Sequence, residues 1–165
     1  MTPIIVNSLR VALFEPQIPP NTGNIARTCS AFNLHLSLIK PLGFSLDDRY
    51  LKRAGLDYWP SVSMETYEDF GDFKSSLSSS ARIVGCSKVG GPTITSTVFT
   101  MHDVLLFGRE DIGLPTEIRN QCNIITTIPM PGGSITTGDN KVRSLNLSSA
   151  VAIIAHEACS QLCFW

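Results

Sequence analysis

The chain has 165 residues, of which 43% are hydrophobic, and it carries a formal net charge of −1. This length supports one domain with a substantial core and is short for two. A nearly neutral chain has no bulk attraction to nucleic acid, so any RNA binding must rely on a local basic patch or on a surface formed by two copies.

The first elements along the chain are a strand, a proline-rich loop, a helix and a second strand. Residues 9–14 are predicted as a strand, and three prolines in residues 15–20 are expected to keep that segment out of any helix. Cap residues predict a helix over about residues 21–32, followed by a strand over 34–39. Arg27 lies opposite the apolar stripe of this helix. An arginine on such a face is more often solvated than functional.

A short helix with a basic side follows. Asp47 or Asp48 is expected to cap it, and Gly55 to end it. Three cations at positions i, i+3 and i+4 share one side: Arg49, Lys52 and Arg53. Such a face is usually only solvated, but beside aromatic residues it could also hold phosphates and stack a base.

The second half of the chain predicts a parallel sheet. A short strand over residues 62–64 and a helix over 67–77 come first. Near-continuous apolar strands follow at residues 82–86, 104–108 and 124–128. Continuous apolar strands that alternate with helices are typical of a parallel sheet covered on both faces. The predicted fold class is therefore α/β, mostly parallel, in a single domain over residues 1–165.

The ends of these strands predict a ligand pocket. Ligands of such sheets bind outside the carboxyl ends of the strands, so the turns at residues 85–88, 108–113 and 129–130 should converge. The last helix begins within residues 144–148, where serine and asparagine offer N-caps beside the same edge. Its residues 150–155 are all apolar and cannot all face one core, which predicts a second copy as a partner.

Several other kinds of site are not indicated. The chain has no GxGxxG and no GxxxxGK[ST] motif, and its three histidines lie in unrelated elements. Its five cysteines include no CxxC pair and are interpreted as core thiols, with no metal required. No apolar run is long enough to cross a bilayer, and no secretory signal opens the chain. We expect a reduced, soluble, cytoplasmic protein.

A series of segments closely resembles the SPOUT methyltransferases, and among them the small tRNA 2′-O-ribose methyltransferases of the wobble position. In chain order they are FEPQIPPNTGNIAR (14–27), PLGF (41–44), RAGLDY (53–58), FGREDIGLP (107–115), IPM (128–130) and SLNLS (144–148). The resemblance implies a C-terminal trefoil knot, a homodimer, S-adenosylmethionine bound among the three turns, and methylation of the 2′-hydroxyl of tRNA nucleotide 34. Two alternatives stay open: methylation of another tRNA or rRNA site, and a non-catalytic RNA-binding dimer.

The resemblance also assigns site residues. It implies largely backbone contacts to the cofactor from Gly85, Cys86, Gly108, Glu110, Gly113, Ile128, Met130, Ser144 and Leu145. It implies Arg27, Ser144 and Asn146 at the reacting centre, and the RNA side would use Arg27 with the basic face of Arg49, Lys52 and Arg53. A guanidinium stays charged and is a poor base, so Arg27 is expected to orient the hydroxyl first.

The connection over residues 131–143 is longer than is typical of the family. It holds three glycines and few apolar residues, so we expect a mobile loop at the mouth of the pocket. Such a loop bears on substrate preference more than on cofactor binding.

Overall fold

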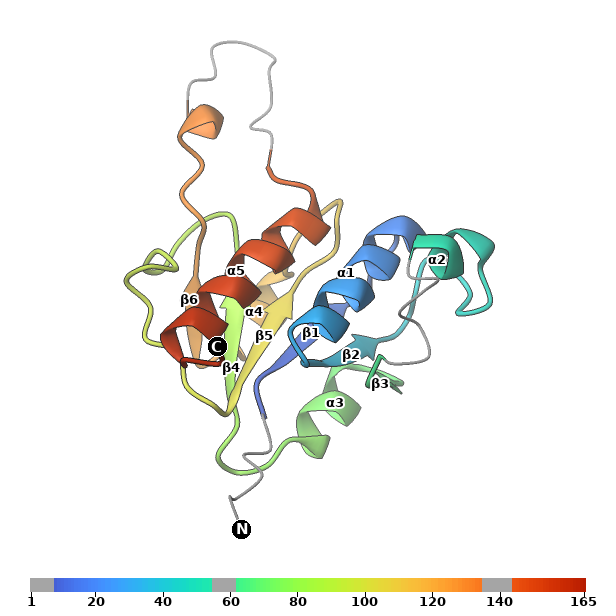
Figure 1. The fold of residues 1–165 in the computed structure, drawn as a ribbon, viewed down its shortest axis with the longest axis horizontal. Coiled ribbons are helices and arrows are strands. Elements are labelled where there is room, and N and C mark those ends of the chain that lie inside the picture. Colours follow the sequence, from blue (N-terminus) through green and yellow to red (C-terminus); the bar gives the residue numbers. More distant parts are fainter. Residues whose placement is uncertain (1–7, 55–61, 135–143) are drawn as a thin grey trace.

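The computed structural model describes residues 8–54, 62–134 and 144–165 (Figure 1). Strands and helices alternate along much of the chain. Their bounds are β1 Arg10–Phe14, α1 Pro19–Ala31, β2 His35–Ile39, α2 Arg49–Ala54, β3 Met64–Tyr67, α3 Phe70–Ser76, β4 Arg82–Cys86, β5 Asp103–Phe107, α4 Thr116–Arg119, β6 Ile124–Thr126, the 3₁₀ helix η2 Pro131–Ser134 and α5 Leu147–Gln161.

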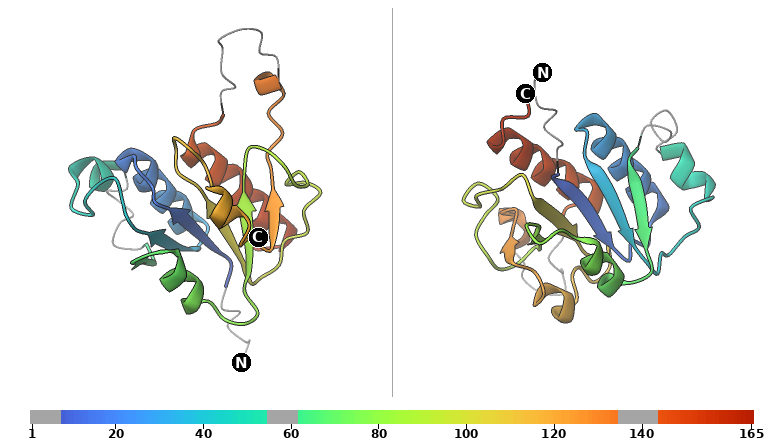
Figure 2. Two further views of the ribbon diagram at one scale, coloured as in Figure 1. Left: turned by 180° about the vertical axis from the view of Figure 1, so that it is seen from behind. Right: turned by 90° about the horizontal axis from the view of Figure 1, so that it is seen from below.

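The strands of the described residues form one parallel sheet in the order β3-β2-β1-β5-β4-β6. The chain builds β2 and β3 on one side of β1, then crosses to place the later strands on the other side. Helices α1 and α5 lie side by side on one face, and α3 and α4 cover the other (Figures 1 and 2). The predicted α/β fold with helices on both faces is confirmed.

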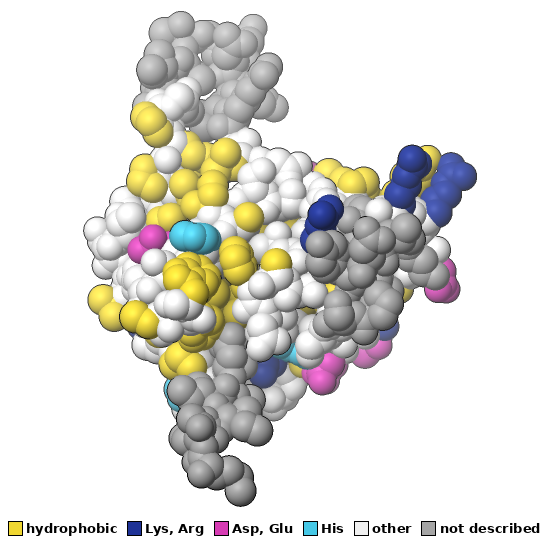
Figure 3. Space-filling view, viewed as in Figure 1, with side chains coloured by type: hydrophobic (Ala, Val, Ile, Leu, Met, Phe, Trp, Pro, Cys, Tyr) yellow, Lys and Arg dark blue, Asp and Glu magenta, His cyan; other side chains and the backbone are white. Residues whose placement is uncertain are grey.

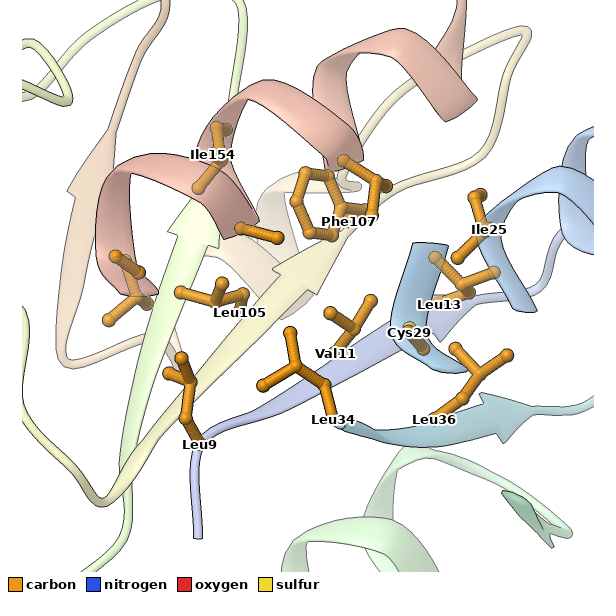
Figure 4. Close-up of a cluster of buried hydrophobic side chains, with 14 of the residues drawn as sticks. Leu9, Val11, Leu13, Ile25, Cys29, Leu34, Leu36, Leu105, Phe107 and Ile154 are labelled. Atoms are coloured by element: carbon orange, nitrogen blue, oxygen red, sulfur yellow. The ribbon is translucent and has the colours of Figure 1, made fainter. Parts of the chain in front are cut away.

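Two apolar clusters hold the sheet between these helices. The cluster under α1 and α5 joins strand and helix side chains (Figure 4), among them Val11, Leu105, Ile25, Cys29 and Ile154. The cluster on the opposite face uses Phe70 and Phe73 of α3 and Ile118 of α4. Fully burying one such side chain stabilises the fold by about 1.5–3 kcal/mol. The sheet is therefore anchored on both faces, and its strand ends are left to form a site.

Helix α1 begins earlier than the sequence indicated. The prediction that residues 15–20 lie outside any helix is wrong for Pro19 and Pro20, which form the first positions of α1. The N–H groups at these positions have no partner within a helix, so proline loses no hydrogen bond there. Ile18 occupies the N-cap position, and its side chain makes no capping bond.

Other boundaries also shift. The predicted helix over residues 67–77 is wrong at its start, because Tyr67 ends β3 and Asp69 caps α3 by accepting from Asp72 N at 2.7 Å. Strand β6 ends at Thr126 rather than at residue 128, since Thr127 pairs with Thr93 instead of with β4. Asp48 caps α2, and the predicted end of that helix at residue 55 lies outside the described residues.

Two further expectations remain predictions. The implied knot depends on a path that includes residues 135–143, which lie outside the described residues. The same holds for most of the loop over residues 131–143, whose first four residues form η2.

Candidate active site

A cavity of about 830 Å³ opens at the carboxyl ends of β4, β5 and β6. Its walls are the turns that follow these strands and the first turns of α5. Each of the three turns grouped from the sequence supplies lining residues, so their predicted convergence is confirmed. The volume lies in the range of about 300–1,000 Å³ that is usual for small-molecule sites.

Two glycines shape the wall that follows β5. The backbones of Arg109 and Gly113 exchange two hydrogen bonds, with N to O distances of 3.1 and 2.8 Å, so the loop folds back on itself. A Cβ on Gly108 would overlap the backbone of Gly113 and Leu114. Gly113 has a φ of +70°, in the left-handed region. The loop can therefore close only with glycine at position 108, and position 113 favours glycine for its conformation.

Arg109 also stiffens this loop. Its guanidinium donates two hydrogen bonds to the carboxylate of Asp111, at 3.0 and 2.8 Å, and lies 3.6 Å from the carboxylate of Glu15. The hydrogen bonding between Arg109 and Asp111 lowers the pKa of Asp111 and raises the pKa of Arg109. Both groups stay charged at neutral pH. Arg109 therefore pairs with Asp111 in the loop and with Glu15 at the end of β1.

Glu110 joins the loop to α1. Its carboxylate accepts from the backbone N–H groups of Gln17 at 2.9 Å and Ile18 at 3.0 Å, where α1 begins. A carboxylate suits this place because a helix N-terminus has unpaired N–H groups and the positive end of the dipole. Glu110 therefore does the capping that Ile18 cannot do. Glu110 also lines the cavity, where it could contact a cofactor. The contact itself stays a prediction.

Asn21 and Asn146 connect the starts of α1 and α5. Asn146 caps α5 by accepting from Ser148 N at 2.8 Å, and its Nδ2 donates to Oδ1 of Asn21 at 3.0 Å. Asn21 also approaches Glu110, with an Nδ2 to Oε1 distance of 3.5 Å. The N-cap role of Asn146 agrees with the sequence. The link to Asn21 joins residues 125 positions apart, so local spacing carried no signal of it.

Most of the residues assigned to the cofactor meet at this cavity. Its lining includes Cys86, Gly108, Glu110, Gly113, Ile128, Met130, Ser144 and Leu145. Gly85 is the exception: it does not line the cavity, and a Cβ there would meet Ile125 and Cys122 instead. Ser87 and Lys88 belong to the turn that the sequence placed at this pocket, although no role was predicted for either. Val89 and Arg119, which also line the cavity, were missed.

The residues assigned to RNA lie apart from this lining. Arg27 is exposed on α1, opposite the buried Ile25 and Cys29, as predicted. It is six residues beyond Asn21, or about 9 Å along the helix axis, and it does not line the cavity. On α2, Arg49 and Arg53 are exposed. The Cζ atom of Arg49 lies 4.8 Å from the centroid of the Tyr50 ring, over its face. The side chain of Lys52 lies outside the described part of the structure.

The chemistry of the lining argues against a thiolate nucleophile. Burial, with a smaller contribution from Cys122, raises the pKa of the Cys86 thiol well above its usual range, so this thiol stays protonated at neutral pH.

Within the described residues, no group of histidine, cysteine or acidic side chains could hold a metal ion. The helices in this part of the chain are also too short or too polar to cross a membrane. The cavity offers backbone groups, apolar side chains and a few charges.

Comparison with known proteins places the chain in a family. Residues 8–156 match the SpoU rRNA Methylase family. Relatives from Yersinia pestis and Methylovorus glucosotrophus, both named tRNA (cytidine(34)-2'-O)-methyltransferase, are each 40% identical to the chain. These matches cover 93% and 92% of this chain, respectively, and 94% of each relative.

Solved structures agree with that match. One, described as "Structural insights into the 2-OH methylation of C/U34 on tRNA", has a TM-score of 0.85 at 42% identity and covers 94% of this chain and 96% of that one. The SpoU methyltransferase AviRb from Streptomyces viridochromogenes, in complex with AdoMet, has a TM-score of 0.80 at 24% identity. That match covers 98% of this chain and 63% of the other, and it supports the fold alone. The chain belongs to the SpoU rRNA methylase family of SPOUT methyltransferases.

Proposed function

We propose that the chain methylates the 2′-hydroxyl of nucleotide 34 of a tRNA in the cytosol, with S-adenosylmethionine as the methyl donor. One observation carries the proposal: three of the segments that match this enzyme group, at residues 107–115, 128–130 and 144–148, line a single cavity at the strand ends, in a chain 40% identical to relatives named for that reaction. Methylation of another tRNA or rRNA site is the second candidate, because the matching family is described by rRNA.

The cavity fits a nucleoside cofactor. Three large apolar side chains at the cavity are unusually exposed: Val89 at 61%, Ile112 at 60% and Leu145 at 39%. Exposed apolar groups beside strand-end backbone groups suit a ligand that has a flat apolar ring with a polar edge. We expect the residues from Gly108 to Gly113, together with Ile128 and Met130, to hold this ligand. When bound, S-adenosylmethionine supplies a methyl group on a sulfonium centre.

The chain's own residues then have positioning tasks. Ser144 lies in the cavity lining, and Asn146 fixes that segment by capping α5. The charged guanidinium of Arg27 is proposed to orient the ribose hydroxyl and the adjoining phosphate, while the proton leaves to phosphate or solvent. Positioning of the reacting groups can supply up to about 7–11 kcal/mol of the barrier. The cavity needs no charged base of its own for this reaction.

A second copy of the chain would complete the site. Because Arg27 is absent from the lining of its own cavity, we expect it to act on the cavity of a partner. On the face of the sheet that α1 and α5 cover, α5 and the C-terminal residues leave Ile153 40% exposed and Trp165 65% exposed, and hydrophobic side chains gather over α5 (Figure 3). The sequence-based reason for a dimer holds in part: Val151, Ile154 and Ala155 are buried within the chain, and Ile153 is the residue that faces outward.

Light scattering tests this association. At micromolar concentration we expect a particle of twice the chain's 18.0 kDa mass. Replacing Ile153 by aspartate should raise the dissociation constant of the dimer, because a charge would then be desolvated in the interface. The control is Ser75→Asp, which places the same charge on an exposed part of α3, on the opposite face of the sheet. Its dissociation constant should equal that of the wild type. A monomeric wild-type chain would count decisively against the dimer.

The basic side of α2 should contribute to RNA affinity. Figure 3 shows lysine and arginine side chains at the end of the molecule that α2 occupies. Replacing Arg49 and Arg53 by alanine should weaken tRNA binding and lower the salt slope by about 0.7–0.9 for each phosphate that is no longer neutralised. Cofactor affinity should not change. An unchanged salt slope would mean that these side chains are only solvated, and attention would pass to Lys141 and Arg143.

Incubation of the protein with labelled S-adenosylmethionine and separate pools of tRNA and rRNA tests the function directly. We expect label to enter tRNA and to stay out of rRNA. Label in rRNA alone would favour the second candidate. RNA binding with no label in either pool would indicate a non-catalytic RNA-binding protein.

A further inference from the structure

Arg119 ties two walls of the cavity together. Its Nη1 donates to Oγ of Ser87 at 2.7 Å, and its Nη2 donates to the backbone oxygen of Val89 at 3.0 Å. The N–H of Val89 also donates to Oγ of Ser87, at 3.3 Å. One guanidinium thus holds a turn that begins directly after β4. Ser87, Val89 and Arg119 all line the cavity.

The next residues of the turn are shaped to fit this side chain. Gly90 has a φ of +81°, and a Cβ at that position would collide with Nη2 of Arg119. Gly91 also has a positive φ, and a Cβ there would overlap the backbone of Ile125. The turn therefore passes between Arg119 and β6 with no room for side chains at these two glycines.

Helix α4 holds the backbone of Arg119 in place. Helix α4 is a single turn, with Ile118 buried in the core and the N–H of Arg119 bonded to the Pro115 oxygen at 2.9 Å. Pro115 directly follows the loop that contains Gly108 and Gly113. Arg119 consequently links the wall after β4 to the wall after β5. Without this side chain, the Val89 oxygen would lose the Nη2 donor, and the turn would be held by the bond from Val89 to Ser87 and by the bond from the Ser87 N–H to the Thr126 oxygen at 3.0 Å.

We propose that Arg119 is a positioning residue of the cofactor site, which acts by fixing the turn from Ser87 to Gly91 as one wall of the cavity. The identity of the ligand rests on the proposed function, and the role of Arg119 rests on the contacts above. Lysine cannot replace it fully, because a single ammonium lacks the planar fork that spans the Ser87 and Val89 oxygens.

A double-mutant cycle tests the proposal. Calorimetry with S-adenosylhomocysteine should show affinity reduced about tenfold or more by Arg119→Ala, since two charge-assisted hydrogen bonds are removed. Ser87→Ala should cause a smaller loss, and the double variant should bind about as weakly as Arg119→Ala alone. Arg119→Lys should recover part of the affinity. Additive losses, or an unchanged affinity in Arg119→Ala, would overturn the proposal.

The control is Lys74→Ala, which removes an exposed cation on α3 that lies near α4 and outside the cavity lining. Its affinity should equal that of the wild type.

Hydrogen exchange of the Val89 to Gly91 amides, measured without ligand, gives a readout independent of activity. Exchange should be about tenfold faster in Arg119→Ala, and an unchanged rate would overturn the proposal. If the wild type failed to bind S-adenosylhomocysteine, the proposed function would fail, and exchange would still decide the role of Arg119. Arg119→Lys provides the exchange test if Arg119→Ala does not fold, with a rate between those of the wild type and a turn without Arg119 contacts expected, and an unchanged rate counting against the proposal.

Discussion

Replacing Arg27 by alanine should reduce methyl transfer to tRNA by about 10²–10³-fold, the cost of losing one preorganised donor at a reacting centre. The affinity for S-adenosylmethionine should change little, because Arg27 lies outside the lining of the cavity in its own chain. Steady-state transfer of labelled methyl groups and calorimetry with S-adenosylhomocysteine measure the two effects separately. We expect a large loss in the rate of methyl transfer with little change in cofactor affinity.

Two further variants sharpen this test. Lys74→Ala removes a cation elsewhere on the surface and should retain full activity. Mixed dimers of Arg27→Ala with a variant that cannot bind the cofactor should regain activity, because one copy supplies Arg27 and the other supplies the cavity. Loss of cofactor affinity in Arg27→Ala would show that the assigned division of roles is wrong.

Replacing Gly108 by alanine should abolish cofactor binding and destabilise the fold by about 3 kcal/mol, the upper end of the usual cost of overpacking. The added Cβ would overlap the backbone of Gly113 and Leu114, which has no flexible side-chain end to move aside. The loop after β5 would have to open, and the Glu110 contact to the start of α1 would shift with it. Urea unfolding and calorimetry with S-adenosylhomocysteine measure the two losses.

Gly132→Ala is the matched control for this variant. A Cβ on Gly132 meets no atom within 4 Å, so stability should stay within about 0.5 kcal/mol of the wild type. A Gly108→Ala variant that bound the cofactor normally would show that the tight closure of this loop is not needed for the site.

The parts of the fold that sequence alone predicted are those with a strong local pattern. The apolar strands at β4 and β5 and the amphipathic face of α1 follow from hydrophobic periodicity, because burial decides where such residues lie. Errors occurred where a distant segment changed a boundary. Thr127 leaves β4 to pair with Thr93, and α1 starts at Pro19 with a cap from Glu110. Neither partner can be identified from local spacing.

The candidate site divides in the same way. Strand-end turns can be read from glycine and proline positions, so the three walls could be grouped from the sequence alone. Arg119 could not, since its contacts to Ser87 and Val89 join positions about 30 residues apart and an arginine in a short helix usually faces solvent. Gly85 lies outside the cavity lining, so the backbone contact to the cofactor that the motif match implied for it stays a prediction.

The most direct test of the central claim is to find the methylated nucleotide. Unmodified tRNA is incubated with the protein and S-adenosylmethionine, digested with a nuclease, and mapped by mass spectrometry. The proposed function requires one added methyl group on the ribose of nucleotide 34, with the base unmodified, and an initial rate of methylation at least about 100-fold lower in a matched reaction with Arg27→Ala. A methyl group on a base, or on the ribose of any other nucleotide, would contradict it.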